Sequence, residues 1–383
     1  MLDFPNAPVL NQKYPQPPVA GVPVYTWDGE KWTTKADALG TSYGRKKNYI
    51  LNGAMGVNQR NPGIAVTANA AHIVDQFFIS TVTDGTMSWQ QVASPTPSGS
   101  PNRIRGTVTV ADAALGTNQY MQVGAKLEGS RVADLLFGSP AAKQFILQFG
   151  VRLPAGTFGV SFMNAAQTRC YADTYTVAAG EANSDATKSI VLTADTLGTW
   201  IKDSSGAGLD IRWSFGCGTS LQGATGVWGA SSLHSSAAQL NVMATNGNVV
   251  ELFDVALYEG NVTQVFEMSD FAETLRNCER LWQSSYAYGT RPGTATNVNQ
   301  EAAWDNGSTA SIIMRNIHWR GKMRAAPTVT MFSPVTGASG VVYNSAGGVD
   351  VAATIDSVGD QSARINGTAT QSWYGHWVAD AGM

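Results

Sequence analysis

The sequence predicts an all-β protein: a jelly-roll-like antiparallel sandwich, a smaller C-terminal β-domain, a short connecting helix and an extended N-terminal anchor. Short segments of alternating apolar and polar residues recur along most of the chain, as expected for strands with one buried face. The 383 residues include 40 glycines and 15 prolines, which is typical of a turn-rich protein. The sequence shows no repeat of fixed period, which counts against a parallel β-helix.

Residues 1–47 are expected to form the N-terminal anchor. Six prolines fall within its first 23 residues and favour an extended, polyproline-like path without a core of its own. Two aromatic segments, 25–27 and 31–33, flank an Asp28-Gly29-Glu30 turn, which predicts a hairpin. A single hairpin is marginally stable in water, so we expect its aromatic side chains to dock on another protomer or another protein.

Residues 48–268 are predicted to form the sandwich. In the segment 209–217, Leu209, Ile211 and Trp213 point to one face and polar residues lie between them. The same alternation occurs in three further segments: 121–127, 145–153 and 158–162. Many short segments of this kind, without long helical patterns between them, favour a jelly roll of roughly eight to ten strands.

Residues 269–283 are predicted to form the connecting helix. Asp270 and Glu273 have the spacing of a capping box. Apolar residues then fall at i, i+4, i+7 and i+11 on one side of the helix: Phe271, Leu275, Cys278 and Trp282. We expect this stripe to pack against the sandwich, so that the helix fixes the angle of the C-terminal domain.

Residues 284–383 are predicted to form the smaller C-terminal β-domain. Its clearest strands are 311–323 and 328–332, with a bend at 324–327 between them. An aromatic segment, 372–378, is expected to be the terminal strand. Trp373 and Trp377 share one parity in that strand and Tyr374 has the other, so their rings are expected to lie on opposite faces.

Several short motifs resemble one family of proteins. Within 255–286, three of them follow a strand, a turn and a helix in that order: Tyr258-Glu259-Gly260, Phe266-Glu267 and Cys278-Glu279-Arg280. This junction resembles that of a family of tailed-phage virion proteins, which are tail fibres or head decorations. The segments 48–61 and 75–80 resemble the first two strands of the same sandwich, and 25–35 resembles the Trp-Asp-Gly hairpin that often starts phage fibre proteins.

The resemblance implies a virion protein that is assembled in the host cytoplasm. It implies attachment to other virion proteins through the N-terminal segment, for which Tyr25, Trp27 and Trp32 are the candidate residues. It also implies a sandwich that resembles carbohydrate-binding modules. No catalytic residue is implied. Fibre-like proteins of this kind bury such N-terminal segments between protomers by rotational symmetry, so we expect a homo-oligomer, a trimer.

Charge and cysteine content exclude several classes of protein. The net charge is −3 and 14% of the residues are charged, which gives no basic footprint for nucleic acid. The single basic cluster, Arg45-Lys46-Lys47, is expected to be a solvated linker. The chain has no apolar stretch of membrane-spanning length, and its start does not read as a signal peptide. Three widely spaced cysteines predict buried free thiols.

No catalytic residue, metal site or cofactor is predicted. Residues 40–44 match the letters G-x-S-x-G, but no strand precedes them and no helix follows to expose the serine. The four histidines lack the spacing of metal ligands. Carboxylates are plentiful, yet no pair among them is identifiable from the sequence as a general acid and base.

The 11 tryptophans suggest how the chain could bind glycans. An exposed indole stacks its apolar face on a sugar ring while its N–H stays hydrated. Trp213 and Trp282 follow apolar patterns and are expected to be core. Trp228 lies in a glycine-rich run and is a candidate for glycan binding. The aromatic residues of the last strand are further candidates: Trp373, Tyr374 and Trp377.

The function that these patterns favour is that of a phage fibre or spike that binds a host surface polysaccharide. A head or collar decoration protein, with contacts only to other virion proteins, is the alternative from a different class. A glycan depolymerase is a third hypothesis. The expected activity is binding without turnover.

Overall fold

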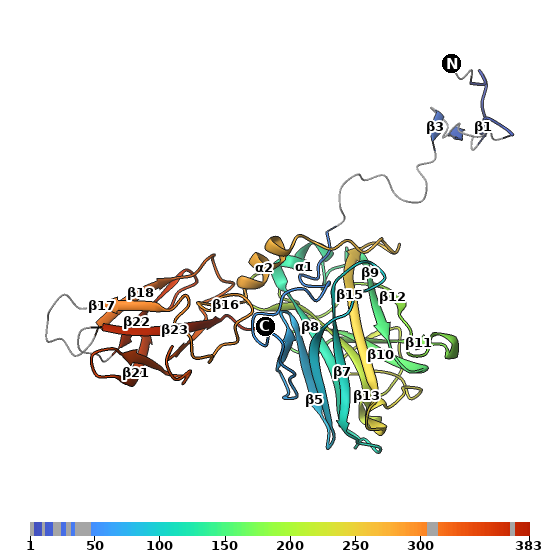
Figure 1. The fold of residues 1–383 in the computed structure, drawn as a ribbon. Helices are drawn as coiled ribbons and strands as arrows, with labels where there is room; N and C mark the ends of the chain where they lie inside the picture. Colours follow the sequence, from blue (N-terminus) through green and yellow to red (C-terminus); the bar gives the residue numbers. More distant parts are fainter. Residues whose placement is uncertain are drawn as a thin grey trace. The chain divides into compact units, whose positions relative to one another are not determined.

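A computed structural model describes residues 4–9, 12–17, 24–27, 32–34, 47–304, 313–367 and 372–383. The contacts divide the chain into two units, Met1–Lys47 and Asn48–Met383. The predicted all-β class is confirmed, because antiparallel strands are the main regular structure among the described residues of both units (Figure 1). No helix in this part of the chain has the length and apolar character that crossing a membrane requires. Residues 40–44, the G-x-S-x-G match, lie outside the described residues.

The N-terminal unit contains the predicted hairpin and one additional strand. β2 (Tyr25–Trp27) pairs with β3 (Trp32–Thr34), with Trp27 opposite Trp32, and β1 (Lys13–Tyr14) pairs with the other edge of β2. Phe4 stacks on Trp32 with ring centroids 5.2 Å apart and meets Tyr25 edge-on at 4.9 Å. The rings of Tyr25, Trp27 and Trp32 are all only half-buried.

The sandwich consists of a seven-stranded and a five-stranded antiparallel sheet. The seven-stranded sheet has the order β14–β11–β10–β13–β8–β5–β4, with β4 (His72–Val74), β5 (Phe77–Val82), β8 (Tyr120–Glu128), β10 (Gly156–Met163), β11 (Cys170–Val177), β13 (Ala207–Cys217) and β14 (Trp228–Gly229). The five-stranded sheet has the order β12–β9–β15–β7–β6, with β6 (Thr86–Ala93), β7 (Asn102–Val110), β9 (Gln144–Arg152), β12 (Ala186–Thr193) and β15 (Val249–Glu259).

The sandwich thus has more strands than the eight to ten predicted. The additional ones include short edge strands such as β14, whose two residues leave no periodic pattern in the sequence. Short helical turns connect the strands: α1 (Gly129–Val132), and 3-10 turns at Ala133–Leu135, Ala179–Glu181, Thr219–Leu221 and Val242–Ala244.

The core of the sandwich lies between its two sheets. Trp213, Phe149 and Phe162 are fully buried there, and the rings of Phe149 and Trp213 meet edge-on at 5.8 Å. The alternation predicted for 209–217 is therefore confirmed for its apolar side. Burial of each such side chain contributes about 1.5–3 kcal/mol relative to exposure, so this layer dominates the stability of the sandwich.

The central part of the other face of the seven-stranded sheet, along β10 and β13, is also buried, although it is polar. The segment 218–241 covers it, because Ser214 Oγ is bonded to the Gln239 amide (3.0 Å from Nε2) and the Cys170 thiol to the Leu233 carbonyl. The approach is closest at Gly159, where a Cβ would lie 2.3 Å from the His234 carbonyl oxygen. Glycine is therefore needed at this position for the segment to lie flat on β10.

Residues 48–61 are not a strand, contrary to the expected resemblance to a first strand. They form turns that are held by Asn52, whose side-chain amide donates to the carbonyls of Val57 (2.8 Å) and Asp75 (3.0 Å). Gly53 lies so close to β15 that a Cβ would be 1.9 Å from the Val255 oxygen. Side-chain bonds to the backbone therefore replace a strand ladder here. The neighbouring expectation, a strand in 75–80, is met in part by β5, which begins at Phe77.

The connecting helix is shorter than predicted. α2 (Phe271–Glu279) begins after Asp270, whose carboxylate accepts from the N–H groups of Ala272 and Glu273, so the predicted N-cap is confirmed. The apolar stripe is confirmed only at Cys278, which is buried, and in part at Leu275, which is half-buried. Phe271 is 47% exposed and packs edge-on against Tyr288 instead.

The stripe ends early because the chain leaves the helix before Trp282. That residue is buried, as predicted, but it opens the strand β16 (Trp282–Ser284), which pairs with the last strand of the chain. The helix is thus less than three turns long, and it is followed directly by the C-terminal sheet.

The C-terminal residues form a curled eight-stranded sheet, part of which follows the path β16–β23–β20–β21–β22–β18. Besides β16, its strands are β17 (Glu301–Trp304), β18 (Ile313–His318), β19 (Thr328–Phe332), β20 (Val341–Asn344), β21 (Val349–Asp356), β22 (Ser362–Gly367) and β23 (Ser372–Asp380). β17 and β19 also pair with β23, which makes β23, the predicted aromatic strand, the centre of the sheet. A second hydrophobic cluster fills its inner face.

Candidate functional site

Two of the predicted glycan-binding residues are buried in the C-terminal core. Trp373 is 0% exposed and its indole N–H donates to the Ile313 carbonyl at 2.9 Å. Trp377 is 3% exposed and packs edge-on against Trp319 with centroids 5.2 Å apart. Neither ring presents a face to solvent, so the prediction that they stack on a sugar is corrected. The shared parity of the two residues is the reason, since both point inward from β23.

Tyr374 has the opposite parity and lies on the outer face of β23, where it is half-buried. Trp304, on the neighbouring strand β17, is 64% exposed. Its ring lies 6.5 Å from that of Tyr374 at an interplanar angle of 86°. On the other side of β23, Tyr343 of β20 stands directly opposite Tyr374 and is also half-buried. Trp304, Tyr374 and Tyr343 thus form a strip across three paired strands, which we call the aromatic strip.

Local alternation places these rings on the outer face. In β17, Ala303 is buried and Trp304 is exposed. In β20, Val342 is fully buried and Tyr343 points away from the core. Because successive side chains of a strand point to opposite faces, the small or apolar inward residue fixes the outward direction of its aromatic neighbour.

Trp304 was not among the residues singled out from the sequence. A signal was present, because Glu301-Ala302-Ala303-Trp304 ends in a large aromatic residue just before Asp305-Asn306-Gly307, a set of turn-forming residues. A tryptophan at the end of a short strand has fewer neighbours to cover it than one in mid-strand.

Polar groups continue the outer face beyond the aromatic strip. Asp350 of β21 stands opposite Tyr343 and accepts a hydrogen bond from the Thr336 hydroxyl. Further along, Asp356 accepts from Arg364 at 2.7 Å and from Asn366 at 2.9 Å. Paired with the guanidinium and the amide, Asp356 has its pKa lowered to about 2. The outer face therefore combines exposed rings with hydrogen-bonding groups.

Two residues after Tyr374 in β23, another segment of the chain covers the outer face. His376 is fully buried there and stacks on Tyr286 with centroids 4.0 Å apart. Its Nε2 lies 2.9 Å from the Thr296 carbonyl, which only accepts, so Nε2 carries the proton. The segment that holds Tyr286 and Thr296 thus forms a raised border beside the aromatic strip.

His376 also contacts a serine hydroxyl. Ser285 Oγ lies 2.9 Å from Nδ1 and accepts from the Trp377 N–H at 3.0 Å. A hydroxyl beside an imidazole is the arrangement of a nucleophile and its base, but Ser285 is 5% exposed and His376 0%. Burial lowers the pKa of His376. With both groups satisfied and out of reach of a substrate, the pair fastens β23 to its neighbours.

Trp228 lies on the sandwich, apart from the aromatic strip. Its indole N–H donates to the Thr193 carbonyl at 2.8 Å, and its ring meets those of Trp200 (5.6 Å) and Phe137 (6.1 Å) edge-on. The residue is half-buried, so part of the ring remains open to solvent. Nearby in the chain, Leu197 and Val227 are 62% and 61% exposed. Trp228 therefore stays a candidate for binding, in a second location.

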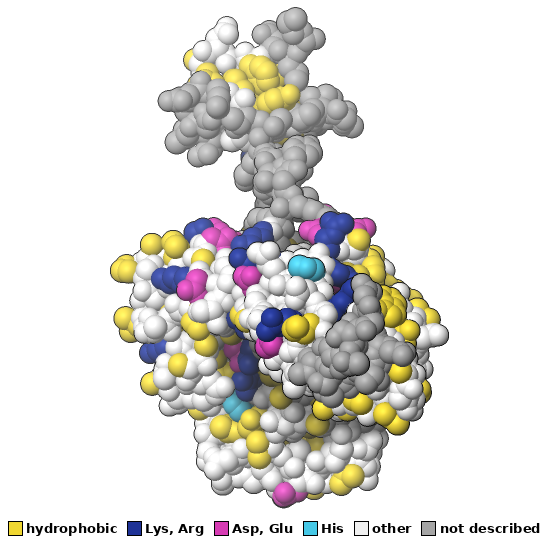
Figure 2. All heavy atoms as spheres, turned by 90° about the vertical axis from the view of Figure 1, so that its left-hand side faces the viewer, with side chains coloured by type: hydrophobic (Ala, Val, Ile, Leu, Met, Phe, Trp, Pro, Cys, Tyr) yellow, Lys and Arg dark blue, Asp and Glu magenta, His cyan; other side chains and the backbone are white. Residues whose placement is uncertain are grey.

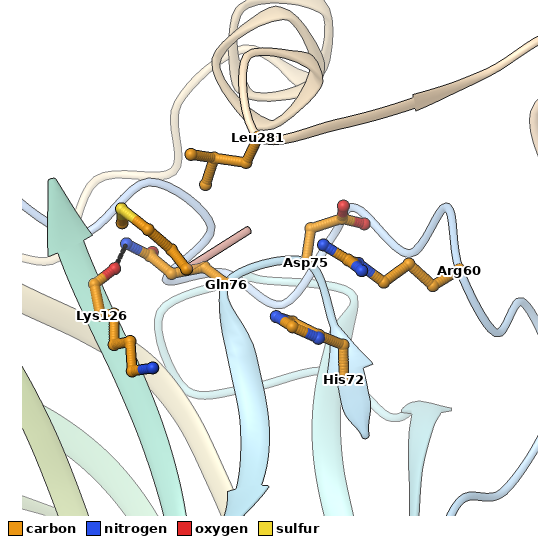
Figure 3. A pocket seen from close by; sticks show the side chains of 7 residues that line it. Arg60, His72, Asp75, Gln76, Lys126 and Leu281 are labelled. Carbon is orange, nitrogen blue, oxygen red and sulfur yellow. Dashed lines mark hydrogen bonds between the residues drawn. The ribbon is translucent and has the colours of Figure 1, made fainter. Parts of the chain in front are cut away.

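A small cleft lies where the sandwich meets α2 and β16. Its lining includes Arg60, His72, Asp75, Gln76, Lys126 and Leu281 (Figure 3). The enclosed space of about 10 Å³ holds one water molecule at most. Burial raises the pKa of Asp75, and burial together with the Arg60 charge lowers that of His72 to about 3. The cleft is too small for an organic ligand.

Hydrogen bonds around the cleft join the sandwich to the C-terminal sheet. Arg60 pairs with Asp380 at 2.6 Å and lies over the Trp282 ring at 5.4 Å. On the other side of the helix, Arg280 pairs with Glu128 at 3.0 Å. Both ion pairs connect the sandwich to residues that follow it in the chain. The cleft is therefore part of a structural junction and not a binding site.

Neither a cluster of like charges nor a group of metal ligands indicates a further site in the described part of the chain. On the face shown in Figure 2, basic and acidic side chains are interspersed among polar and hydrophobic ones. Nowhere among the described residues do three His, Cys, Asp or Glu side chains gather in a position to hold a metal ion. All three cysteines are free and buried, as predicted.

Comparisons with known proteins give distant likenesses only. No family model and no curated protein matches. Among solved structures, the enzymatically active domain of tailspike protein 4 from bacteriophage CBA120 aligns over 52% of this chain and 22% of its own, with 11% identity and a TM-score of 0.28. The arabinose-bound α-L-arabinofuranosidase MgGH51 aligns over 62% of this chain and 30% of its own (9%, TM-score 0.31).

A family 11 carbohydrate-binding module of Clostridium thermocellum aligns over 52% of this chain and 98% of its own, with 9% identity and a TM-score of 0.27. The chain spans less than a third of the tailspike domain and of the arabinofuranosidase. At such identities and TM-scores, these likenesses do not identify a family, an activity or a ligand for this chain.

Proposed function

We propose that the chain is a carbohydrate-binding virion protein, a phage fibre or spike whose aromatic strip contacts a glycan of the host surface. The observation that carries the glycan part is the exposed Trp304 ring at right angles to Tyr374 on the open face of the C-terminal sheet. The resemblance of 255–286 to virion proteins supports the virion part.

Neighbouring exposed aromatic side chains often mark an interaction site, because the surface of a soluble protein has few contiguous apolar patches. An indole face and a phenol edge fit the C–H faces of sugar rings, while the phenol hydroxyls stay available to donate and accept. Thr336, Asp350 and Asn366 continue the same face with further hydrogen-bonding groups. This mixture of rings and polar groups suits a sugar better than a purely apolar partner.

The proposal assigns attachment to the N-terminal unit. Tyr25, Trp27 and Trp32 form a ring cluster that the described residues of this unit cover only by half. A three-stranded sheet of this size is marginal by itself, so a further protein or further copies of the chain would complete its burial. We propose a homotrimer held in part by this unit, with the same rings available to the other virion proteins.

The proposed activity is binding without turnover. The Ser285–His376 pair, the closest approach to a nucleophile and base in the described part of the chain, is inaccessible. Incubation with a host polysaccharide should leave its chain length unchanged by size-exclusion chromatography. Shortened chains would instead support a depolymerase.

The test compares adhesion of three purified variants to host cells. Trp304→Ala and Tyr374→Ala are each expected to weaken adhesion at least about tenfold, equivalent to ~1.4 kcal/mol. Val110→Ala, which truncates an apolar residue on the sandwich that is 51% exposed, is the matched control and should leave adhesion unchanged. A chain that adheres to no host cell or surface glycan would favour the purely structural head or collar protein.

A further inference from the structure

We propose that the glycan recognised by the aromatic strip is a single, neutral, linear chain that runs across the strands. One sugar ring would sit in the corner between Trp304 and Tyr374, and the next would lie toward Tyr343. This inference rests on the proposed function and adds the class of ligand to it. Three features carry it: the angle between the rings, their placement on successive strands, and the charge of the surrounding face.

The angle between the rings excludes a flat ligand. Trp304 and Tyr374 stand at 86° with centroids 6.5 Å apart, so they form a corner. A crystalline polysaccharide presents a plane, which contacts only one wall of a corner. A sugar ring of a free chain places its face on one aromatic ring and its edge against the other, which satisfies both.

The placement on successive strands sets the direction of the chain. Tyr374 and Tyr343 are direct cross-strand partners, and β17 pairs with β23 from the other side. Trp304 stands opposite Ser372, two residues along β23 from Tyr374. The strip therefore crosses two strand spacings, about 9.5 Å, with an offset of roughly 7 Å along the strands, dimensions that suit a disaccharide unit. Along β23 the border at Tyr286 and His376 closes the face. A linear glycan fits in the direction across the strands.

The charge of this face disfavours an acidic glycan. Asp350 lies opposite Tyr343, and its hydrogen-bond partner, Thr336, is neutral. Further along β21 on the same face, the Asp356 carboxylate is compensated by Arg364. Residues 305–312 and 368–371, which adjoin the strip in the sequence, contain no Lys or Arg. The strip thus ends in one carboxylate that no salt bridge neutralises among the described residues, and a like charge on the ligand is repelled.

The experiment uses an array of bacterial surface polysaccharides with known neutral and acidic members, probed with the full chain. For acidic members, the carboxyl-reduced form is the matched probe, because reduction removes the charge and keeps the linkage. We expect neutral members to bind, and reduction of an acidic member to raise its affinity about fivefold, the factor for ~1 kcal/mol between unit charges about 4 Å apart in water. Insoluble microcrystalline cellulose should not retain the chain.

Asp350→Asn separates this inference from the proposed function. It should leave the affinity for neutral members within about twofold, and it should abolish most of the difference between acidic and reduced forms. The difference in the unsubstituted chain should shrink with added salt, since exposed charges are screened. Tighter binding of the acidic forms, or a preference that Asp350→Asn leaves unchanged, would overturn the neutral ligand while Trp304-dependent adhesion still stood. If the unsubstituted chain binds no glycan at all, both the neutral ligand and the proposed function are overturned.

Discussion

The sandwich and the C-terminal sheet differ in what covers their outer faces. In the sandwich, the segment 218–241 lies over the centre of the outer face of the seven-stranded sheet, and polar residues of β10 and β13 are buried there. Arg212 there is only 8% exposed and is bonded to Asp210 and Ser80. In the C-terminal sheet, the outer face carries Trp304 at 64% exposure. The comparison shows that alternation identifies the two faces of a strand but not which of them a later segment will cover.

The same contrast applies to individual tryptophans. Trp228 of the sandwich has its N–H bonded and its ring set against Trp200 and Phe137. Among the described residues, Trp304 of the C-terminal sheet has one close aromatic neighbour, Tyr374. The covered part of the Trp228 ring adds to stability, whereas most of the Trp304 ring is available to a ligand. Three changes test this division between structural and binding residues, in order of decreasing effect.

The largest effect is expected from Trp373→Ala. The ring is 0% exposed, so its loss should lower the free energy of unfolding by about 3–5 kcal/mol. Urea titration followed by circular dichroism measures the change. Trp304→Ala, which removes the same side chain from the outer face, is the control and should change stability by no more than about 0.5 kcal/mol. Equal losses of stability in both variants would show that the inner and outer faces of the sheet contribute equally to stability.

An intermediate effect is expected from pH at the covered face of the sandwich. Burial and the Arg212 charge lower the pKa of His234 to about 4, and its ring meets Tyr120 edge-on at 4.8 Å. Between pH 6.5 and 4 the unfolded chain therefore binds more protons than the folded chain at this residue, so stability falls as pH falls. From pH 7 to pH 5 the loss from His234 should be roughly 2 kcal/mol.

The variant His234→Phe isolates that contribution, because it keeps an aromatic ring beside Tyr120 and does not titrate. Urea midpoints of the two proteins at pH 7 and pH 5 give the difference. His72 and His376, whose pKa values are also lowered, remain in both proteins and cancel. An identical loss of stability in the variant would mean that His234 is protonated in the folded state or reaches solvent.

The smallest effect is expected at the joint between the two regions. Leu275 is half-buried on α2, so Leu275→Ala should cost about 1–2 kcal/mol, less than the 2–5 kcal/mol of a fully buried leucine. Thermal unfolding measures it, with Arg276→Ala on the exposed side of the same helix as the control. A loss above about 3 kcal/mol would indicate that the helix packs more tightly on the sandwich than its exposure suggests.

The sequence by itself determined those elements whose forces act over a few residues. The existence of the hairpin of β2 and β3, the cap at Asp270 and the inward side of Leu209, Ile211 and Trp213 all follow from turn chemistry, a local hydrogen bond or the period of two. The parity that separates Tyr374 from Trp373 and Trp377 was also readable, because it is a property of one strand.

The tertiary structure alone decided which surfaces are open. Trp373 and Trp377 lie inside because β17, β18 and β22 curl around them, and Trp304 lies outside because no described segment returns over it. Residues 48–61 form turns and not a strand because Asn52 and Gly53 meet partners far along the chain, including Val255. Burial depends on contacts between residues distant in sequence, and no local pattern encodes which of two strand faces receives them.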